Sequence, residues 1–388
     1  MGTLRLAPAS TEDYRRLAER RLPRFLFDYI DGGAYDEVTL GANVADLRAL
    51  ELRQRVMRDV SRIDTEVEVL GEAWSMPLAI SPVGLAGMMG RRAEVQAVQV
   101  ADALGIPFCL STVGICSVEE VAAVARRPFW FQLYMMRDRG HVRDLIGRAA
   151  AAGCRTLVLT VDLAVVGARY RDVRNGLSGG TTVWSRLRGR WAEILTHPRW
   201  VWDVGLRGKP HVFGNISDYV PDASTPEDFR SWVDSQFDPS VTWLDIEWLR
   251  GLWDGPIVVK GVLTSEDAVA AADAGAQAVV VSNHGGRQLD GVPSSIRALP
   301  RIVDAAGDRV EVLVDSGIRN GQDVARAVAL GAKAAMVGRA WIWAMAARGG
   351  PGLHALLKTF RSELRTTMQL TGCTSVDELG PHILEGAE

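Results

Sequence analysis

A histidine and an arginine stand three residues apart in Ser282-Asn283-His284-Gly285-Gly286-Arg287, directly after an apolar, β-branched run. Histidine is the side chain best suited to take a proton near neutral pH, and arginine presents a rigid fork that matches a carboxylate or phosphate. The paired glycines allow a sharp turn and let a flat ligand approach the backbone. The loop therefore predicts a site that deprotonates a small acid. A capped loop with an incidental histidine is the alternative.

Seven other apolar runs with strand character also end in polar residues or glycine. The eight runs are 78–82, 106–111, 129–134, 156–161, 256–260, 277–282, 311–315 and 334–338. Their ends carry Ser81-Pro82-Val83-Gly84, Ser111-Thr112, Gln132-Leu133-Tyr134, Thr160-Val161-Asp162, Lys260-Gly261, Ser282-Asn283-His284, Asp315-Ser316-Gly317 and Gly338-Arg339. One polar end is ordinary loop chemistry, but a full ring of them favours a pocket for a cofactor and a substrate.

The segments that separate these runs have helical patterns, so the strands are expected to be parallel with right-handed crossovers. Helices are predicted at 94–104, 118–126, 139–152, 264–274, 319–330 and 351–366. Eight repeats indicate the α/β class and a (β/α)8 TIM barrel, with its active site at the carboxyl ends of the strands. An open parallel sheet is the alternative. The whole chain, 1–388, is expected to form a single domain, with an N-terminal helical segment at about 1–60.

The last two strand ends predict a phosphate site. Asp315-Ser316-Gly317-Ile318-Arg319 and Gly338-Arg339 occupy the position where this fold often binds phosphate with backbone N–H groups and a helix N-terminus. The expected ligand is a phosphate-bearing cofactor. No metal is expected, because no His, Cys and carboxylate cluster has the spacing of metal ligands. The histidines at 141, 197, 211, 354 and 382 are interpreted as surface residues.

Composition limits the class of protein. The net charge is −3 with 47% hydrophobic residues, which gives no general case for a nucleic-acid partner. The four cysteines lack metal-type spacing, and we expect them to be reduced. We also expect no secretory signal and no membrane-spanning helix, because no apolar run is long enough.

One long segment after the fourth strand, about 173–245, breaks the alternation as an insert. The region between the fourth and fifth strands is rich in tryptophan: Trp184, Trp191, Trp200, Trp202, Trp232, Trp243, Trp248 and Trp253. Its first part is also rich in arginine. Aromatic and basic residues together are typical of a membrane interface. An ordered lid packed on the barrel explains them equally well, and nucleic-acid stacking less well.

With these motifs in order, the chain resembles the FMN-dependent α-hydroxy acid dehydrogenase and oxidase family from about residue 11 to 375. The motifs include Phe27-Asp28-Tyr29-Ile30-Asp31-Gly32-Gly33-Ala34, Pro82-Val83-Gly84, Gly167-Ala168-Arg169-Tyr170-Arg171-Asp172 and Ser282 to Asp290. The Trp-rich insert resembles that of the bacterial respiratory, quinone-linked members. Tyr29, which alone would be interpreted as a packing residue, gains a role from this resemblance.

The resemblance implies roles for the ring of polar residues. His284 would be the general base at C2 of the hydroxy acid, and Asp162 would orient its imidazole. Arg169 and Arg287 would hold the substrate carboxylate, with Tyr29 and Tyr134 as hydroxyl donors. Lys260 would face the N1/C2 edge of the flavin ring. The remaining cofactor-binding residues would be Pro82, Val83, Gly84, Ser111, Gln132, Thr160 and Ser282 around the ring, and Asp315, Ser316, Gly317, Arg319, Gly338 and Arg339 around the phosphate.

The implied function is FMN-dependent oxidation of an (S)-2-hydroxy acid, with L-lactate oxidised to pyruvate and the electrons passed to a membrane quinone. The implied location is peripheral, on the cytoplasmic face of the inner membrane, and the implied assembly is a homotetramer. Three alternatives stay open on the residues: a soluble oxidase of lactate, glycolate or mandelate type that reduces O2 to H2O2, a redox-neutral barrel lyase or isomerase, and a flavin-binding module without catalysis.

Overall fold

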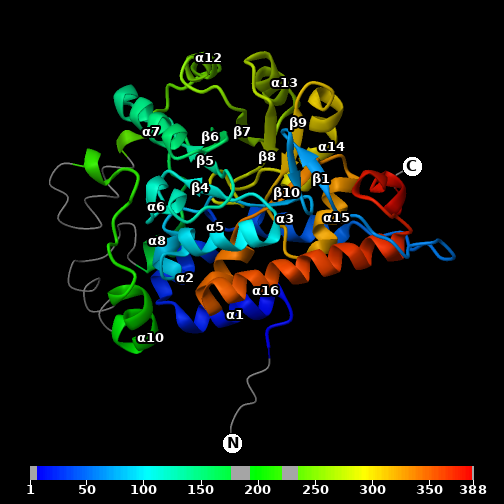
Figure 1. Cartoon of the computed structure of the whole chain (residues 1–388), viewed down its shortest axis with the longest axis horizontal. Coiled ribbons are helices and arrows are strands. Elements are labelled where there is room, and N and C mark those ends of the chain that lie inside the picture. The colour runs from blue at the N-terminus through cyan, green and yellow to red at the C-terminus, as the bar shows by residue number, and fades with distance from the viewer. Residues whose placement is uncertain (1–6, 176–192, 221–234, 387–388) are drawn as a thin grey trace, which may run out of the picture.

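Eight parallel strands form a closed barrel in the computed structural model, which describes residues 7–175, 193–220 and 235–386 (Figure 1). They are β3 (Leu78–Ile80), β4 (Cys109–Ser111), β5 (Trp130–Leu133), β6 (Thr156–Thr160), β7 (Ile257–Val262), β8 (Ala278–Val281), β9 (Glu311–Val314) and β10 (Ala334–Val337). Pairing runs β3-β10-β9-β8-β7-β6-β5-β4, and a parallel bridge from Ile80 to Phe108 joins the two ends. The predicted (β/α)8 barrel is confirmed, and the open-sheet alternative is wrong.

The bodies of the barrel strands are almost wholly buried, while their carboxyl ends bear polar side chains. In β8 all four residues, from Ala278 to Val281, are buried, and polar Ser282 and Asn283 follow. Such near-continuous apolar runs are expected for parallel strands that are covered on both faces. Parallel order brings every carboxyl end to one mouth of the barrel, so the polar ends form a ring there.

The helices that surround the barrel occur largely where the sequence predicted them (Figure 1). They are α4 (Ala86–Met89), α5 (Ala93–Leu104), α6 (Val118–Ala122), α7 (Arg139–Ala151), α13 (Ser265–Asp273), α14 (Ser295–Ala306), α15 (Gly321–Ala329) and α16 (Arg339–Thr371). Two differences stand out. The last helix begins at Arg339, not at 351, and is broken at Gly349, whose φ is +65°. The helix α14 was not predicted, and it contains Pro300, a residue that is unfavourable in a helix interior.

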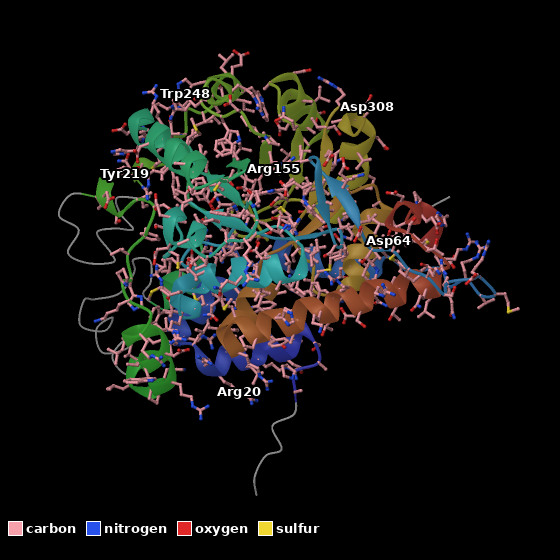
Figure 2. The ribbon with its side chains drawn as sticks, in the orientation of Figure 1. Arg20, Asp64, Arg155, Tyr219, Trp248 and Asp308 are labelled. Atoms are coloured by element: carbon pink, nitrogen blue, oxygen red, sulfur yellow. The ribbon has the colours of Figure 1, made fainter. Side chains whose placement is uncertain are left out.

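The N-terminal segment forms α1 (Thr11–Arg21), α2 (Arg24–Asp31) and α3 (Val38–Ala49). Ser10 and Asp13 make a reciprocal capping box at the start of α1. This helix packs along α16, with Tyr14 and Ala18 buried, and Figure 2 shows Arg20 pointing away from the body of the protein. The helix α2 ends before Gly32, as predicted, and carries Tyr29 to the mouth of the barrel. The helical part ends at residue 49, earlier than the predicted 60.

A short antiparallel hairpin, β1 (Val67–Val69) with β2 (Glu72–Trp74), was not predicted. Trp74 packs against Trp130 with ring centroids 5.5 Å apart, and the indole N–H of Trp130 donates to Glu72. Since Trp130 is the first residue of β5, the hairpin lies at the amino ends of the barrel strands. It therefore contacts the barrel at the end opposite to the ring of polar residues.

The insert is described in part, as α8 (Tyr170–Arg174), α10 (Pro198–Trp200), a π-helical turn η1 (Val201–Leu206), η2 (Ser217–Tyr219) and α12 (Leu244–Arg250). Trp184, Trp191 and Trp232 lie outside the described residues. Trp200 and Trp253 are buried. Trp248 lies in α12, with its ring centroid within 6.0 Å of the guanidinium carbons of Arg139 and Arg143 (Figure 2). Trp202, in contrast, is 61% exposed. Within the described ranges, the lid and the membrane interpretations each account for some of the tryptophans.

Two further expectations concern the redox state of the cysteines and the presence of membrane-spanning helices. All four cysteines are buried free thiols, and burial raises the pKa of Cys116 and Cys154. Two short 3-10 turns, η3 (Val376–Glu378) and η4 (Pro381–Ile383), complete the fold. In the part of the chain that the structure describes, every helix is too short or too polar to cross a bilayer.

Candidate active site

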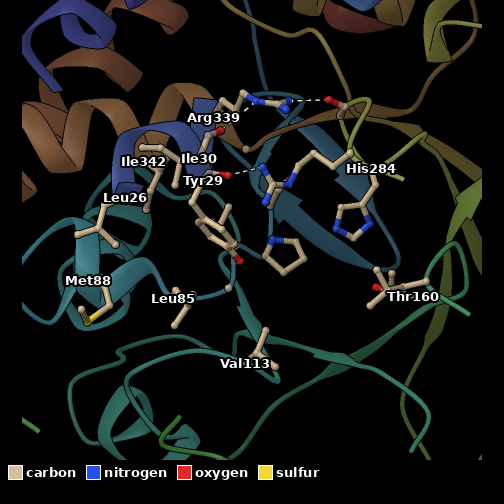
Figure 3. Close-up of a pocket in the computed structure, with 18 of the residues that line it drawn as sticks. Leu26, Tyr29, Ile30, Leu85, Met88, Val113, Thr160, His284, Arg339 and Ile342 are labelled. Carbon is tan, nitrogen blue, oxygen red and sulfur yellow. Dashed lines mark hydrogen bonds between the residues drawn. The ribbon is translucent and has the colours of Figure 1, made fainter. Parts of the chain in front are cut away.

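The loop after β8 is held in an unusual backbone conformation. Three successive residues have positive φ: His284 at +56°, Gly285 at +68° and Gly286 at +72°. A Cβ at Gly286 would lie 2.6 Å from the backbone nitrogen of Leu40, so only glycine fits there. A left-handed histidine is uncommon, and such strain concentrates at functional sites. The turn brings the His284 side chain to the wall of a cavity (Figure 3).

His284 forms a hydrogen-bonded pair with Asp162, which follows β6. The distance from Nδ1 to the Asp162 Oδ1 atom is 2.8 Å. Gly261 makes room for this carboxylate, because a Cβ there would lie 2.7 Å from the Asp162 side chain. Burial lowers the pKa of His284, although the Asp162 carboxylate opposes the shift. Burial acts to raise the pKa of Asp162, but His284 outweighs it and the pKa is lowered. Near neutral pH the pair is therefore a neutral imidazole beside a carboxylate, and Nε2 is the nitrogen that can accept a proton.

Two partly buried arginines at the mouth donate to main-chain carbonyl groups, mostly at the end of α2. Arg287 donates to the carbonyl oxygens of Tyr29 and Gly32, and Arg339 donates to Ile30, Gly32 and Gly285. In the described part of the chain, these guanidinium groups bond to carbonyls and not to carboxylates. Burial lowers the pKa of Arg339, and the charges of nearby arginines add to this effect. The mouth thus holds excess positive charge, which favours an anionic ligand.

Two tyrosines stand beside these cations. The guanidinium carbons of Arg287 and Arg169 lie 4.8 Å and 6.0 Å from the ring centroid of Tyr29. Tyr134 contacts Phe237 edge-on, with centroids 5.2 Å apart. Burial, together with the negative charge of Asp162, raises the pKa of Tyr134, so its phenol stays protonated and can donate a hydrogen bond.

Lys260, at the end of β7, is a buried ammonium group with two partners. Its Nζ lies 2.9 Å from an Asp315 carboxylate oxygen and donates to the hydroxyl of Ser282 at 3.0 Å. Burial acts to lower the pKa of Lys260, but Asp315 and Asp162 outweigh it and the pKa is raised. In this structure the carboxylate of Asp315 therefore pairs with Lys260.

A single cavity of about 610 Å³ brings most of the predicted site residues together. Sixteen of them line it: Tyr29, Pro82, Val83, Gly84, Tyr134, Thr160, Arg169, Lys260, His284, Arg287, Asp315, Ser316, Gly317, Arg319, Gly338 and Arg339. The other four, Asp162, Ser111, Gln132 and Ser282, do not line the wall. Asp162 and Ser282 bond to residues that do, and Ser111 donates to Gln132. Residues 169, 284 and 287, far apart in the chain, converge as predicted.

Several lining residues were missed by sequence reasoning, and six of these come from the insert. They are Ile194, Trp200, His211, Val212, Phe213 and Phe237. His211 had been interpreted as a surface residue, but it is partly buried and lines the cavity. Leu85, which follows Pro82-Val83-Gly84, also lines it. The concentration of aromatic residues in the insert was the one signal available, and it did not say which of them face the barrel.

Comparison with known proteins identifies the family to which the chain belongs. Residues 18–386 match the family model described as FMN-dependent dehydrogenase. The chain belongs to the FMN-dependent dehydrogenase family. L-lactate dehydrogenases of Caulobacter sp. (strain K31) and Alcaligenes faecalis are each 53% identical over 376 residues, which is 97% of this chain and 98% of theirs.

Solved structures agree with this assignment. A monotopic membrane protein, (S)-mandelate dehydrogenase, superimposes with a TM-score of 0.91 at 35% identity, over 98% of this chain and all of that one. A mandelate oxidase with benzoyl-formic acid has a TM-score of 0.81 at 37% identity, over 98% of both chains. The predicted family resemblance is confirmed. This family member is an FMN-dependent oxidoreductase acting on a CH–OH group, so the redox-neutral and non-catalytic alternatives are wrong.

The residues present suit the family cofactor. Three buried polar atoms near the strand ends have no partner among the described residues: the Ser81 and Thr160 hydroxyls and the Gln132 amide nitrogen. Buried polar groups are nearly always hydrogen-bonded, so these atoms suit the polar edge of a bound ring. A Cβ at Gly317 would lie 2.1 Å from the Asn43 carbonyl oxygen, which leaves glycine as the only residue that fits beside Arg319. In the same described ranges, no group of three or more histidine, cysteine or acidic side chains could hold a metal ion.

Proposed function

We propose that this protein oxidises L-lactate to pyruvate and passes the electrons to a membrane quinone. The observation that carries the proposal is that a general base and two arginines converge on one cavity. The base is His284, hydrogen-bonded to Asp162, and the arginines are Arg169 and Arg287. A base and a carboxylate clamp are what a small hydroxy acid requires. The relatives at 53% identity are L-lactate dehydrogenases, which supports lactate as the substrate.

His284 acts as the general base in this proposal. Its Nε2 takes a proton from the substrate while Asp162 holds the ring through Nδ1 and stabilises the imidazolium that forms. The cation of this pair is favoured because the carboxylate is only 2.8 Å away. When bound, FMN accepts the two electrons that leave the substrate C2.

The substrate carboxylate is bound by Arg169 and Arg287, and the hydroxyl groups of Tyr29 and Tyr134 donate hydrogen bonds to the carboxylate or hydroxyl side. A rigid guanidinium fork suits a carboxylate better than a lysine does. The raised pKa of Tyr134 keeps the phenol a donor. Phe237 packs on Tyr134 and so fixes the direction of that donor.

The cofactor is held along the ring of strand ends. The flavin ring is surrounded by Pro82, Val83, Gly84, Ser111, Gln132, Thr160 and Ser282. The phosphate is bound by Ser316, Gly317, Arg319, Gly338 and Arg339. Lys260 supplies the positive charge that favours a reduced, anionic ring. Asp315 contributes by holding that ammonium group, because their contact is 2.9 Å.

The proposed location is the cytoplasmic face of the inner membrane, on a docking surface formed by the insert. Three apolar side chains, Leu195, Trp202 and Leu206, are 77%, 61% and 53% exposed and form what we call the apolar crest. Arg199, Arg207 and Lys209 are exposed nearby in the chain. Apolar side chains that enter the interface, with cations that meet anionic lipid, would hold the protein peripherally. The structural relative called a monotopic membrane protein supports this location.

The full chain is proposed to act as one domain and to assemble as a homotetramer. The barrel, the N-terminal helices and the C-terminal helix α16 share one continuous hydrophobic core, which supports a single domain. Analytical ultracentrifugation of the detergent-free protein would measure the assembly, and a monomer would contradict that part of the proposal.

L-lactate is expected to bleach the flavin when it is mixed anaerobically with the purified, yellow protein. Mandelate and glycolate, mixed in the same way, should reduce it more slowly. Substrate specificity is measured as the reduction rate divided by the dissociation constant. Loss of flavin absorbance with mandelate but not with lactate would contradict lactate as the substrate. A full molar yield of H2O2 per turnover in air, with no quinone reduction, would instead indicate the soluble oxidase.

The Asp162→Asn variant is expected to change both the rate and the pH profile of flavin reduction. Asp162 acts to raise the pKa of His284, so its removal lowers that pKa, and the acid limb of the profile moves to lower pH. The plateau rate falls about 10- to 150-fold, since a charge-assisted hydrogen bond contributes about 1.5–3 kcal/mol. Stopped-flow reduction between pH 4.5 and 8 measures both effects. A lower plateau with an unmoved acid limb would contradict the assigned pair.

The double variant Trp202→Glu, Leu206→Glu is expected to bind membranes at least about tenfold more weakly, because burial of one large apolar side chain contributes about 1.5–3 kcal/mol. The measurement is co-sedimentation with vesicles that contain anionic lipid. The matched control is Leu370→Glu, since Leu370 is also 53% exposed but lies in the C-terminal turns of α16, on the opposite side of the molecule (Figure 1). Equal sedimentation of all three proteins would contradict the crest as the docking surface.

A further inference from the structure

The cavity has two chemically different halves, and Tyr29 stands between them. Figure 3 shows His284 and Thr160 on one side of Tyr29, and Leu26, Leu85 and Met88 on the other. The first half carries the base and the buried cations. The second half, which we call the apolar lobe, is lined by Leu26, Leu85, Met88, Trp200, Val212 and Phe213.

The apolar lobe is built from three separate parts of the chain that are fixed to one another. Leu26 comes from α2, Leu85 caps the start of α4, Met88 lies in α4, and the other residues come from the insert. The indole N–H of Trp200 donates to the Met88 carbonyl oxygen at 2.9 Å, and Trp200 is 6% exposed. Arg21 of α1 also pairs with Asp203 of η1 at 2.6 Å. These contacts hold the insert against the barrel mouth as one wall of the lobe.

The apolar lobe does not suit the hydroxy acid. The six lining side chains that define it are uncharged, and a carboxylate placed among them would lose its hydration without gaining a cation. An apolar, partly planar molecule would bury its surface there at a gain of about 25 cal/mol per Å². The lobe also adjoins the half of the cavity where oxidation occurs. Its occupant is therefore expected to be the second substrate, the electron acceptor, and to be apolar.

The lobe also reaches the outside beside the proposed membrane face. Val212 lines the cavity and is 36% exposed, so it lies at the rim. The apolar crest (Leu195, Trp202 and Leu206) belongs to the same stretch of the insert, and η1 packs against α4, which carries Met88. The crest and the rim of the lobe therefore belong to one stretch of the insert, residues 195–213.

One polar side chain in the lobe can serve the ring of such an acceptor. The Nε2 atom of His211 lies 3.0 Å from the carbonyl oxygen of Gly205. A carbonyl only accepts, so Nε2 carries a hydrogen and Nδ1 is the variable site. That Nδ1 is buried and has no partner among the described residues. When it carries a proton, this nitrogen can donate a hydrogen bond to a ring oxygen and deliver the proton there, and when neutral it can accept a hydrogen bond from the hydroxyl of the reduced ring.

We propose that the apolar lobe binds the ring and the first part of the tail of a quinone, and that His211 protonates one quinone oxygen. The inference rests on the proposed function, since it locates the acceptor of that reaction. The overall change balances: the hydroxy acid loses two electrons and two protons and becomes the 2-oxo acid, and the quinone gains two of each and becomes the quinol. His211 supplies one of those protons and is reprotonated from solvent. Solvent at the rim of the cavity supplies the other, and the two protons that the hydroxy acid loses return to solvent.

Two variants test the site, with a short-chain benzoquinone and hexacyanoferrate(III) as alternative acceptors in the absence of vesicles. Val212→Trp fills the rim, and His211→Ala removes the proton donor. We expect the ratio of quinone-linked to hexacyanoferrate-linked turnover to fall at least about tenfold for Val212→Trp, through the quinone KM. For His211→Ala the ratio should fall about 10²-fold, through kcat, in keeping with the loss of a general acid. Leu244→Trp is the matched control, because Leu244 also lies in the insert and is 71% exposed but does not line the cavity, and its ratio should equal that of the wild type.

The outcomes separate this inference from the proposed function. Wild-type ratios in both Val212→Trp and His211→Ala, with an active wild type, overturn the placement of the quinone but leave the reaction intact. A wild-type flavin that lactate bleaches but that reduces no quinone overturns both the acceptor and this site. A wild-type flavin that lactate does not bleach overturns the proposed substrate, and then the same ratios are measured with the hydroxy acid that does bleach it.

Discussion

Replacing His284 by Gln is expected to slow flavin reduction by L-lactate about 10²- to 10⁴-fold, the usual contribution of a general base. Glutamine keeps a polar side chain of similar size, so the loop of three left-handed residues at 284–286 should persist. The lost property is the proton acceptor, because Nε2 is the ring nitrogen left when Nδ1 is bound to Asp162. The measurement is anaerobic stopped-flow reduction, with the bound flavin quantified by its absorbance.

The control for this variant is His382→Gln, since His382 is exposed and lies in the C-terminal turn η4. That substitution should leave the reduction rate and the flavin content at wild-type values. A His284→Gln protein that binds flavin fully and is reduced at nearly the wild-type rate would remove His284 from the role of base. Loss of flavin from His284→Gln would show a structural defect, and His284→Asn would then be measured to separate the two effects.

Replacing Arg287 by Met is expected to raise the KM for L-lactate at least about 30-fold. Truncating one partner of a buried, hydrogen-bonded charge pair costs about 2–5 kcal/mol, and here the partner left unpaired is the substrate carboxylate. A smaller fall in kcat should accompany it, because Arg287 also donates to the carbonyl of Tyr29 and lies 4.8 Å from its ring. Steady-state kinetics with hexacyanoferrate(III) as acceptor measures both constants.

Two further variants sharpen the interpretation of Arg287→Met. Arg287→Lys keeps the charge and loses the planar fork, so its KM should lie between those of Arg287→Met and the wild type. Arg297→Met is the matched control, because Arg297 is exposed on α14. An unchanged KM in Arg287→Met would mean that Arg287 serves only to fix α2, and that the carboxylate is bound elsewhere.

The positive charge at the barrel mouth links these predictions. Arg287 and Arg339 give their hydrogen bonds to the carbonyl end of α2, where the helix dipole is negative. Those contacts position Tyr29 without neutralising either guanidinium, so the net charge stays available to two anions, the substrate carboxylate and the cofactor phosphate. The same feature explains why the half of the cavity without arginines is suited to an uncharged ligand.

The sequence alone determined the barrel and the ring of strand-end residues. Strands such as β8 are continuous apolar runs of β-branched residues, which is a local signal, and parallel order brings every carboxyl end to one mouth. The position of Asp162 or Lys260 after its strand therefore implied its place in the site. The N-terminal helix that carries Tyr29 came from local signals too, since Gly32 ends it.

The tertiary structure alone decided which residues of the insert face the cavity. Trp200 is buried and Trp202 is exposed, because residues two apart on a helical turn face opposite sides. The segment is short and irregular, with a π-helical turn, so its sequence has no sustained period that would show which of the two faces the barrel. His211, Val212 and Phe237 line the cavity for the same reason. The pairing of Lys260 with Asp315 was also hidden, since both are polar strand ends and only the distance between them, 2.9 Å, distinguishes a partner from a ligand. Local patterns determine what each segment is, whereas the contacts between segments distant in the chain depend on how they pack.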